Sequence, residues 1–253
     1  MGNLLVPDDC RVCGLPLRNF HRIPVCESCL EQTQPFETDL ACVQCRTPFS
    51  NARPLDETGR CLACRLGARS FDAAYSYGEY DGVLRRLIHL YKYQQVSSLE
   101  HFFVPRLVEA LPRDAEFDWV TAVPLHWRRH WARGFNQSAH LAKGVSRRLC
   151  VPWRKLLWRR RATPKQARLS GAARRNNLKG AFTVMPWDRE RIAGRRILLV
   201  DDVYTTGSTA EACARALRRA GARSVTVLTL ARVDRRAGVE PYPRARAALS
   251  SSS

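Results

Sequence analysis

The chain has 253 residues, of which 45% are hydrophobic and 26% charged, a composition typical of a soluble globular protein and not of a disordered one. This length accommodates one ordinary domain and a small additional module. No apolar run reaches the ~18 residues of a membrane-spanning helix, and the cysteines, acids and prolines of the first twenty residues are unlike a signal peptide. We therefore expect a cytoplasmic protein without membrane insertion.

The formal net charge is +19, and most of it lies in the middle of the chain. Residues 123–196 contain twenty lysines and arginines but only two acids, Asp188 and Glu190. A solvated surface is the simplest explanation of a basic run, but so many like charges repel one another and destabilise a compact state. The region therefore indicates an anionic partner, either a phosphorylated small molecule or a nucleic acid.

Cysteines dominate the beginning of the chain, where eight of the ten form four CxxC pairs. These are Cys10/Cys13, Cys26/Cys29, Cys42/Cys45 and Cys61/Cys64. One CxxC turn directs two thiolates to an ion about 2.3 Å away, and two turns complete a tetrahedral zinc site. Disulfides are the alternative, but a cytoplasmic chain disfavours them, and a redox role would explain only one pair. We expect a double zinc ribbon over residues 8–66 with two structural zinc ions.

Spacing leaves the pairing of the cysteines open. The simplest partition is sequential, with the first two pairs on one ion and the last two on the other, but an interleaved arrangement has the same spacing. The segment contains few large apolar residues and needs the metal to supply the folding energy of a core. The remaining cysteines, Cys150 and Cys213, are expected to be packing residues.

From residue 71 the chain alternates strand and helix patterns. Strands are predicted over residues 73–80, 119–123, 196–200 and 224–233, and helices over residues 83–93, 99–111, 137–149 and 209–220. An arginine-rich loop is expected over residues 159–179. Because strand, helix and strand follow in this order, the fold class expected for residues 71–236 is α/β, a parallel sheet flanked by helices. The serine-rich tail, residues 237–253, is expected to be disordered.

The most informative motif is VDDVYTTGST, residues 200–209, where the strand 196–200 is closed by two acids and a loop leads into a helix. A glycine lets the backbone approach a phosphate, and hydroxyls, backbone N–H groups and the positive helix end bind its oxygens. Adjacent carboxylates at a strand's carboxyl end accept hydrogen bonds from the vicinal hydroxyls of a ribose. The predicted phosphate and ribose site consists of Asp201, Asp202, Val203, Tyr204, Thr205, Thr206, Gly207, Ser208 and Thr209.

Residues 200–209 resemble the phosphoribosyl pyrophosphate signature of type I phosphoribosyltransferases. The wider chain resembles the ComF family of competence-associated proteins, which join a cysteine-rich zinc module to such a domain. Neither GxxxxGK[ST] nor GxGxxG is present to suggest another nucleotide site. Beyond the signature, the resemblance rests on residues 123–126, 128, 133–137 and 180–182 and on Leu87, Ile88, Lys92, Thr163, Gln166, Leu169, Arg174 and Asn177.

This resemblance implies that Mg²⁺ accompanies phosphoribosyl pyrophosphate and that Asp201 and Asp202 are the catalytic pair holding the ribose hydroxyls. It also implies that residues 159–182 form a basic hood that closes over the substrate, where Lys165 is one candidate clamp. The residues expected to bind the diphosphate are Leu125, His126, Arg128, Arg133, Arg168, Arg174 and Arg175. A solvated surface charge is the alternative for each arginine.

Two functions follow. The first is a protein that binds phosphoribosyl pyrophosphate, acts in DNA uptake and natural transformation, and also binds single-stranded DNA. Aromatic residues within the basic region suit base stacking, namely Trp127, Trp131, Phe135, Trp153 and Trp158. The second is an active Mg²⁺-dependent phosphoribosyltransferase of nucleotide metabolism whose acceptor the sequence does not identify. The family resemblance alone suggests a DNA-uptake helicase as a protein partner.

Overall fold

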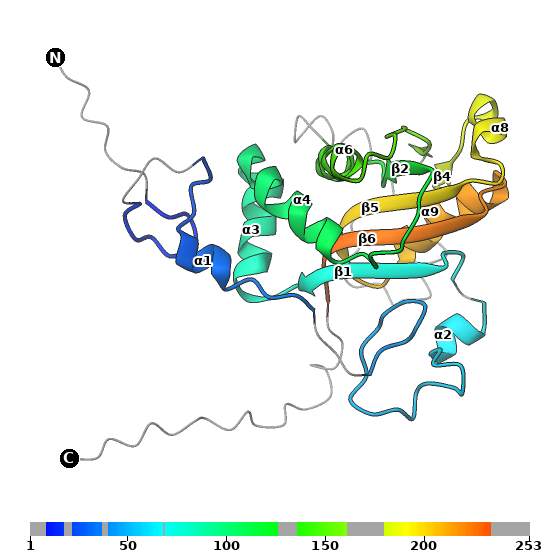
Figure 1. Cartoon of the computed structure of the whole chain (residues 1–253), viewed down its shortest axis with the longest axis horizontal. Coiled ribbons are helices and arrows are strands. Elements are labelled where there is room, and N and C mark those ends of the chain that lie inside the picture. The colour runs from blue at the N-terminus through cyan, green and yellow to red at the C-terminus, as the bar shows by residue number, and fades with distance from the viewer. Residues whose placement is uncertain are drawn as a thin grey trace.

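The computed structural model describes residues 9–17, 22–36, 40–67, 69–125, 136–160 and 180–233. Its centre is a four-stranded, all-parallel sheet in the order β1-β6-β5-β2 (Figure 1). These strands are β1 (Ala73–Glu79), β2 (Trp119–Ala122), β5 (Arg196–Tyr204) and β6 (Ser224–Arg232). A short antiparallel pair consists of β3 (Trp158–Arg159) and β4 (Phe182–Thr183). The predicted parallel α/β sheet is confirmed.

Four longer helices of the described residues cover the sheet, with α3, α4 and α6 on one face and α9 on the other (Figure 1). They are α3 (Gly82–Tyr93), α4 (Glu100–Glu109), α6 (Gln137–Leu149) and α9 (Ser208–Arg219). The shorter helices are α1 (Glu27–Glu31), α2 (Leu62–Arg65), α8 (Arg189–Ile192), and the 3₁₀ turns η1 (Ser97–Leu99) and η2 (Pro186–Asp188). No helix in the described ranges is long and apolar enough to cross a membrane.

Side chains of the central strands alternate between two hydrophobic cores. In β5, Leu198 and Val200 pack with α3, α4 and α6, whereas Ile197 and Leu199 pack with α9. Successive side chains of a strand point to opposite faces, and both faces of this sheet are covered. Burial on both faces therefore explains why residues 197–200 of β5 are all apolar and do not alternate with polar residues.

The first cysteine cluster (Cys10, Cys13, Cys26 and Cys29) lies on the face that carries α3. Cys10 and Cys29 are buried in the same core as α3, and Arg86 Nη1 of that helix donates a hydrogen bond to Val12 O over 3.3 Å. Figure 1 shows this segment, with α1, beside α3. The segment therefore completes a core of the sheet domain.

The second cysteine cluster (Cys42, Cys45, Cys61 and Cys64) belongs to the other core, together with α9. All four of its cysteines are buried. Ala74 N of β1 donates a hydrogen bond to Gln44 O over 3.0 Å, which joins the segment to the edge of the sheet. The two clusters thus lie against opposite faces of the same sheet, at separate places in Figure 1.

Strand β5 is longer than the sequence predicts. The expectation that it ends at Val200 is wrong, because Asp201, Val203 and Tyr204 still pair with residues of β6. Backbone pairing in the middle of a sheet outweighs the low strand propensity of aspartate. The acidic pair consequently lies on a rigid strand and not on a loop.

The two cysteines outside the CxxC pairs differ in their surroundings. Cys213 is fully buried in the core with α9, as expected. The expectation that Cys150 is a packing residue is wrong, because its side chain is exposed. Cys150 ends α6 with φ 55°, the left-handed conformation that closes a helix at its surface end.

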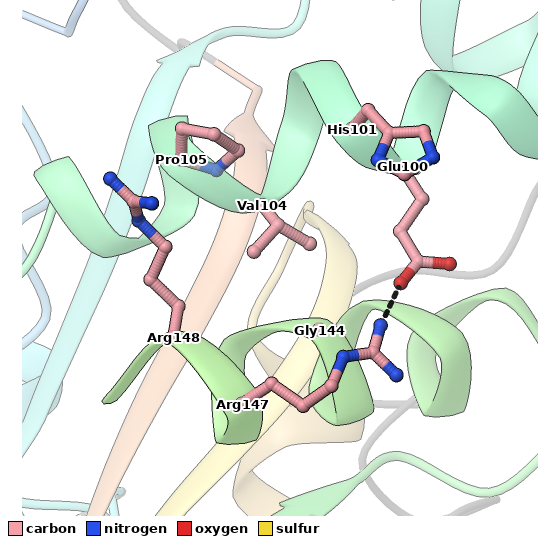
Figure 2. A pocket seen from close by; sticks show the side chains of 7 residues that line it. All are labelled: Glu100, His101, Val104, Pro105, Gly144, Arg147 and Arg148. Carbon is pink, nitrogen blue, oxygen red and sulfur yellow. Dashed lines mark hydrogen bonds and ion pairs between the residues drawn. The ribbon is translucent and has the colours of Figure 1, made fainter. Parts of the chain in front are cut away.

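Helices α4 and α6 cross closely at a glycine. A Cβ on Gly144 would overlap Val104 Cγ2 and lie 3.0 Å from Glu100 Oε1. Figure 2 shows this crossing and the groove beside it, in which Arg147 forms a 2.8 Å ion pair with Glu100. The crossing fixes α6 against the sheet, and the first turn of α6 reaches the acidic pair.

Candidate functional site

The acidic pair lies near the carboxyl end of β5, where α3 and α6 approach it. Lys92 Nζ of α3 lies 2.9 Å from Asp202 Oδ1, and these side chains are 13% and 16% exposed. Ser138 Oγ of α6 donates a hydrogen bond to Asp201 Oδ1 over 2.9 Å, and the Asp202 N–H donates to the same oxygen. Three elements distant in sequence thus form an acidic site with a cation built into it.

Two polar residues hold the start of α6 in place. Asn136 Oδ1 accepts a 3.4 Å hydrogen bond from Ala139 N as the helix N-cap, and Asn136 Nδ2 donates to Val123 O just after β2. The buried Gln137 donates from Nε2 to Lys92 O over 3.2 Å. The end of α3 and the start of α6 are therefore joined directly, which fixes both helices relative to the acidic pair.

Burial shifts the pKa of Asp201 most strongly among the groups of this site. It raises the pKa of Asp201 to about 7, and the negative charge of Asp202 acts in the same direction. Burial disfavours the charged form of Lys92, but the Asp202 carboxylate outweighs this effect, so the pKa of Lys92 is raised. Asp201 consequently exchanges its proton near neutral pH, whereas Lys92 stays positive.

The turn between β5 and α9 has the features of an anion site. Gly207 is the N-cap of α9 with φ 70°, and a Cβ there would overlap the Tyr204 hydroxyl and stand 2.9 Å from Arg69 Nη1. Thr206 Oγ1 and Ser208 Oγ are hydrogen-bonded over 2.7 Å. Hydroxyls and the first N–H groups of a helix therefore gather where a phosphate would be stabilised.

Tyr204 faces the interior of the protein. Its side chain is 5% exposed, and its ring packs edge-to-face on Phe71 with the centroids 6.3 Å apart. The guanidinium of Arg232 lies 4.9 Å from the ring centroid, and burial raises the pKa of the Tyr204 hydroxyl to about 12. A part for Tyr204 in ligand binding would therefore be limited to its backbone.

Of the residues expected to bind a diphosphate, the structure describes Leu125. It is half-buried and follows β2, whose end is joined to β5 by a 3.0 Å hydrogen bond from Val123 N to Val200 O. Leu125 thus lies at the same end of the sheet as the acidic pair, where the parallel strands β2 and β5 have their carboxyl ends. The other expected diphosphate residues lie outside the described residues, namely His126, Arg128, Arg133, Lys165, Arg168, Arg174 and Arg175.

The eight paired cysteines form two groups in sequential order, and within each group the sulfur atoms lie within 4.8 Å of one another. The sulfurs of Cys13 and Cys26 are 3.7 Å apart, as are those of Cys45 and Cys61. Four sulfurs placed tetrahedrally about 2.3 Å from one ion lie about 3.8 Å from each other. Each cluster could therefore hold one zinc ion, and the interleaved arrangement does not occur.

Backbone groups support thiolates in both clusters. Cys26 N donates to Cys10 Sγ, and Cys61 N donates to Cys42 Sγ, each over 3.3 Å. The hydrogen bond from the Cys45 thiol, together with backbone N–H groups, lowers the pKa of Cys42 to about 4. Because metal ligands must be deprotonated, these donors favour the metal-binding form of the sulfurs.

Sequence reasoning assigned no role to several residues around the site. Ser138 and Gln137 contact it only because α6 packs against the sheet. Glu211 on the first turn of α9 is 3% exposed, accepts from Ser70 N and Oγ, and pairs with Arg215 over 2.8 Å. An acid in the first turn of the helix that follows the predicted phosphate loop was a signal in the sequence that a positive partner was needed.

Replacing Asp201 by asparagine is expected to stabilise the fold at alkaline pH. Because the folded-state pKa is raised from 3.8 to about 7, the stability supplied by the bound proton is present at low pH and lost as the pH rises through 7. Asparagine stays neutral, so the free energy of unfolding should exceed that of the wild type by about 1–3 kcal/mol near pH 8, and by less near pH 5. Urea denaturation at both pH values measures this.

Asp202→Asn is the matched control for that measurement. It deprives the half-buried Lys92 of its closest partner, and it should lower the free energy of unfolding by about 1–3 kcal/mol. The same change in stability for both substitutions would contradict the assignment of the titrating proton to Asp201.

Comparison with known proteins supports this reading of the fold. Residues 136–243 match the family model described as a phosphoribosyl transferase domain. The DNA utilization protein YhgH of Escherichia coli (strain K12) is 35% identical over 242 residues, which cover 90% of this chain and 99% of that protein. The Competence protein F of Haemophilus influenzae is 34% identical over 180 residues, which cover 68% of this chain and 78% of that protein.

A third relative is more distant. The Competence protein ComFC of Streptococcus pneumoniae is 27% identical over 189 residues, which cover 72% of this chain and 79% of that protein. The matched domain includes α6, β5 and α9, which carry Ser138, the acidic pair and the turn that follows it, and also β6. With near-complete coverage of a relative at 35% identity, the chain belongs to the ComF family.

Proposed function

We propose that this protein binds phosphoribosyl pyrophosphate, or a related phosphoribosyl ligand, and acts in DNA uptake. The observation that carries the ligand is the continuity of β5 and α9, which places the acidic pair only a few residues before the donor-rich turn. A 5-phosphate at the turn leaves the ribose hydroxyls within reach of the carboxylates. The names of the relatives, DNA utilization protein and Competence protein, support the cellular role.

Different residues of the site bind different parts of the ligand. The hydroxyls of Thr206 and Ser208 and the N–H groups at the start of α9 bind the phosphate. Asp201 and Asp202 accept hydrogen bonds from the ribose hydroxyls, and Lys92 offsets their negative charge. When bound, Mg²⁺ supplies positive charge to the diphosphate. Phosphoribosyl transfer to an acceptor is the alternative use of this site, and pyrophosphate release with nucleobases or amines measures it.

Isothermal titration calorimetry with ribose 5-phosphate, and with phosphoribosyl pyrophosphate and Mg²⁺, tests the ligand. The double substitution Asp201→Asn/Asp202→Asn should weaken binding at least about tenfold, because two charged acceptors of hydroxyl groups are removed. Asp118→Asn is the matched control, since Asp118 pairs with Arg196 at the opposite end of β5. Equal binding by the acidic-pair variant would exclude the ribose assignment, and no binding by the wild type would refute the proposal.

The cysteine clusters fit zinc, and their role is structural. Four sulfur ligands leave no open coordination position for a substrate, and the tetrahedral spacing of the sulfurs suits this ion. Each cluster also lies in a hydrophobic core that includes residues of the sheet. Zinc binding would therefore stabilise both faces of the domain.

Metal analysis of the purified protein should find two zinc ions per chain. Cys10→Ser and Cys42→Ser should each lose one ion, because each removes a ligand from a different cluster. Cys150→Ser should retain both ions, since Cys150 is exposed at the end of α6 and belongs to neither cluster. Loss of both ions from either single-cluster variant would show that the sites are not independent.

Single-stranded DNA is the second ligand that we propose, on the evidence of cations stacked on indole rings. In and after α6, the pairs and their distances to the ring centroids are Lys143–Trp153 at 5.1 Å, Arg154–Trp119 at 4.9 Å and Lys155–Trp158 at 3.6 Å. Trp158 is 37% exposed, and two further cations, Arg147 and Arg148 of α6, line the groove in Figure 2. Cations and aromatic faces together suit phosphates and bases.

Fluorescence anisotropy with a labelled oligothymidine tests this second ligand. Affinity should fall steeply between roughly 50 and 200 mM salt as counterions compete. Trp158→Ala should weaken binding by about tenfold through lost stacking, and Arg148→Gln/Lys155→Gln should reduce the salt dependence. The control Arg53→Gln/Arg60→Gln removes two exposed arginines of the second cysteine segment. An affinity that does not change with salt, or an equal effect of the control, would exclude this surface.

A further inference from the structure

Arg69 lies against the phosphate turn, although it belongs to the segment that leads from the second cysteine cluster to β1. Its Nη2 donates a hydrogen bond to Thr206 O over 3.1 Å. We infer that Arg69 is a positioning residue, whose hydrogen bond to Thr206 O aims the Gly207 N–H at a bound phosphate. The inference rests on the proposed function of the same turn.

The geometry of the peptide bond carries the argument. A trans peptide directs its C=O and its N–H to opposite sides. Because Arg69 holds the Thr206 carbonyl on its own side, the Gly207 N–H faces away from Arg69. Within the described part of the chain, no acceptor pairs with that N–H. Gly207 O accepts a hydrogen bond from Glu211 N over 2.8 Å, so the carbonyl group of Gly207 is fixed by the first turn of α9.

Arg69 is itself held in place by its neighbour in sequence. The N–H and Oγ of Ser70 donate to the buried carboxylate of Glu211 over 2.5 and 2.7 Å, and Ser70 O accepts from Arg218 Nε over 3.3 Å. Glu211 and Arg218 both belong to α9. The segment that carries Arg69 is thus attached to the same helix whose N-terminus forms the phosphate turn.

Charge gives Arg69 a second effect at the turn. Glu211 places a carboxylate on the first turn of α9, where its negative charge would repel a phosphate. Arg215 forms a 2.8 Å ion pair with this carboxylate, and Arg69 adds a positive charge closer to the turn. Arg69 does not need to touch the ligand for this effect, and it lies on the side of Gly207 that a Cβ would occupy.

The second cysteine cluster supports the turn through another arginine. Arg232, 2% exposed, donates from Nη2 to Cys45 O over 2.6 Å, and its guanidinium lies 4.9 Å from the ring centroid of Tyr204. The Tyr204 hydroxyl in turn lies against Gly207. Arg69 and Arg232 therefore join one cysteine segment to the turn, while the first cluster lies on the opposite face of the sheet.

Titration of ribose 5-phosphate, followed by ¹⁵N NMR, tests the role of Arg69. Arg69→Met should bind about tenfold more weakly than the wild type. This is the size expected when one hydrogen bond to a charged group is lost, here the bond from the Gly207 N–H to the phosphate. The Gly207 amide signal of this variant should no longer respond to the ligand. Arg69→Lys, which keeps the charge and one donor, should be intermediate. Arg60→Met, which removes an exposed arginine of the second cysteine segment, should bind as tightly as the wild type.

Wild-type affinity of Arg69→Met, or equal losses for Arg69→Met and Arg60→Met, would overturn the inference. If the wild type does not bind ribose 5-phosphate, the proposed function fails, and the ligand-free spectra then decide the inference. Without ligand, Arg69→Met should shift or broaden the Gly207 amide signal, because the Thr206–Gly207 peptide is no longer held in one orientation. An unchanged Gly207 signal in a folded variant would refute the role of Arg69 independently of the ligand.

Discussion

Two adjacent carboxylates on a central, largely buried strand are costly unless positive charge and hydrogen-bond donors reach them. Lys92 and Ser138 meet this requirement from α3 and α6, two helices on the same face of the sheet. The placement of both helices is accordingly tied to the acidic pair, through the N-cap of α6 and the bond from Gln137 to the end of α3. The compensation is incomplete, since the pKa of Asp201 remains near 7. Such residual destabilisation is typical of positions kept for binding and not for stability.

The cysteine segments meet a different constraint. The sequence of residues 9–67 contains few large apolar residues. Cys10, Cys29 and all four cysteines of the second cluster are buried in the two cores of the sheet domain, whereas Cys13 is exposed. The first segment reaches α3, and the second reaches α9 and the carboxyl end of β6. The two clusters therefore differ in the parts of the sheet domain that they contact. Among the described residues, the second cluster is the one connected to the turn between β5 and α9, through the contacts of Arg69 and Arg232. Two cysteine clusters that look like copies in sequence thus have different neighbours.

Positive charge in the middle of the chain is partly neutralised within the fold. Arg147 pairs with Glu100, and Arg196 pairs with Glu116 and Asp118. Other cations of this region stack on tryptophan rings, as Lys155 does on Trp158. Neither arrangement removes the large surplus of cations over acids in the region. This surplus of positive charge is the basis on which we propose anionic ligands for the protein.

The sequence by itself determined the parallel α/β fold, the glycine turn that leads from β5 into α9 and the four cysteine pairs, because periodicity, glycine requirements and ligand spacing are local properties. Val200 was a wrong end for β5, since pairing with β6 continues to Tyr204 and cannot be seen in local propensity. Cys150 was wrongly expected to pack, because its left-handed backbone at the end of α6 turns it outward. Only the tertiary structure brought Lys92, Ser138 and Arg69 to the site and made the cysteine partition sequential. Contacts across long stretches of chain depend on how helices pack on the two faces of the sheet, and a linear pattern does not encode that packing in any single segment.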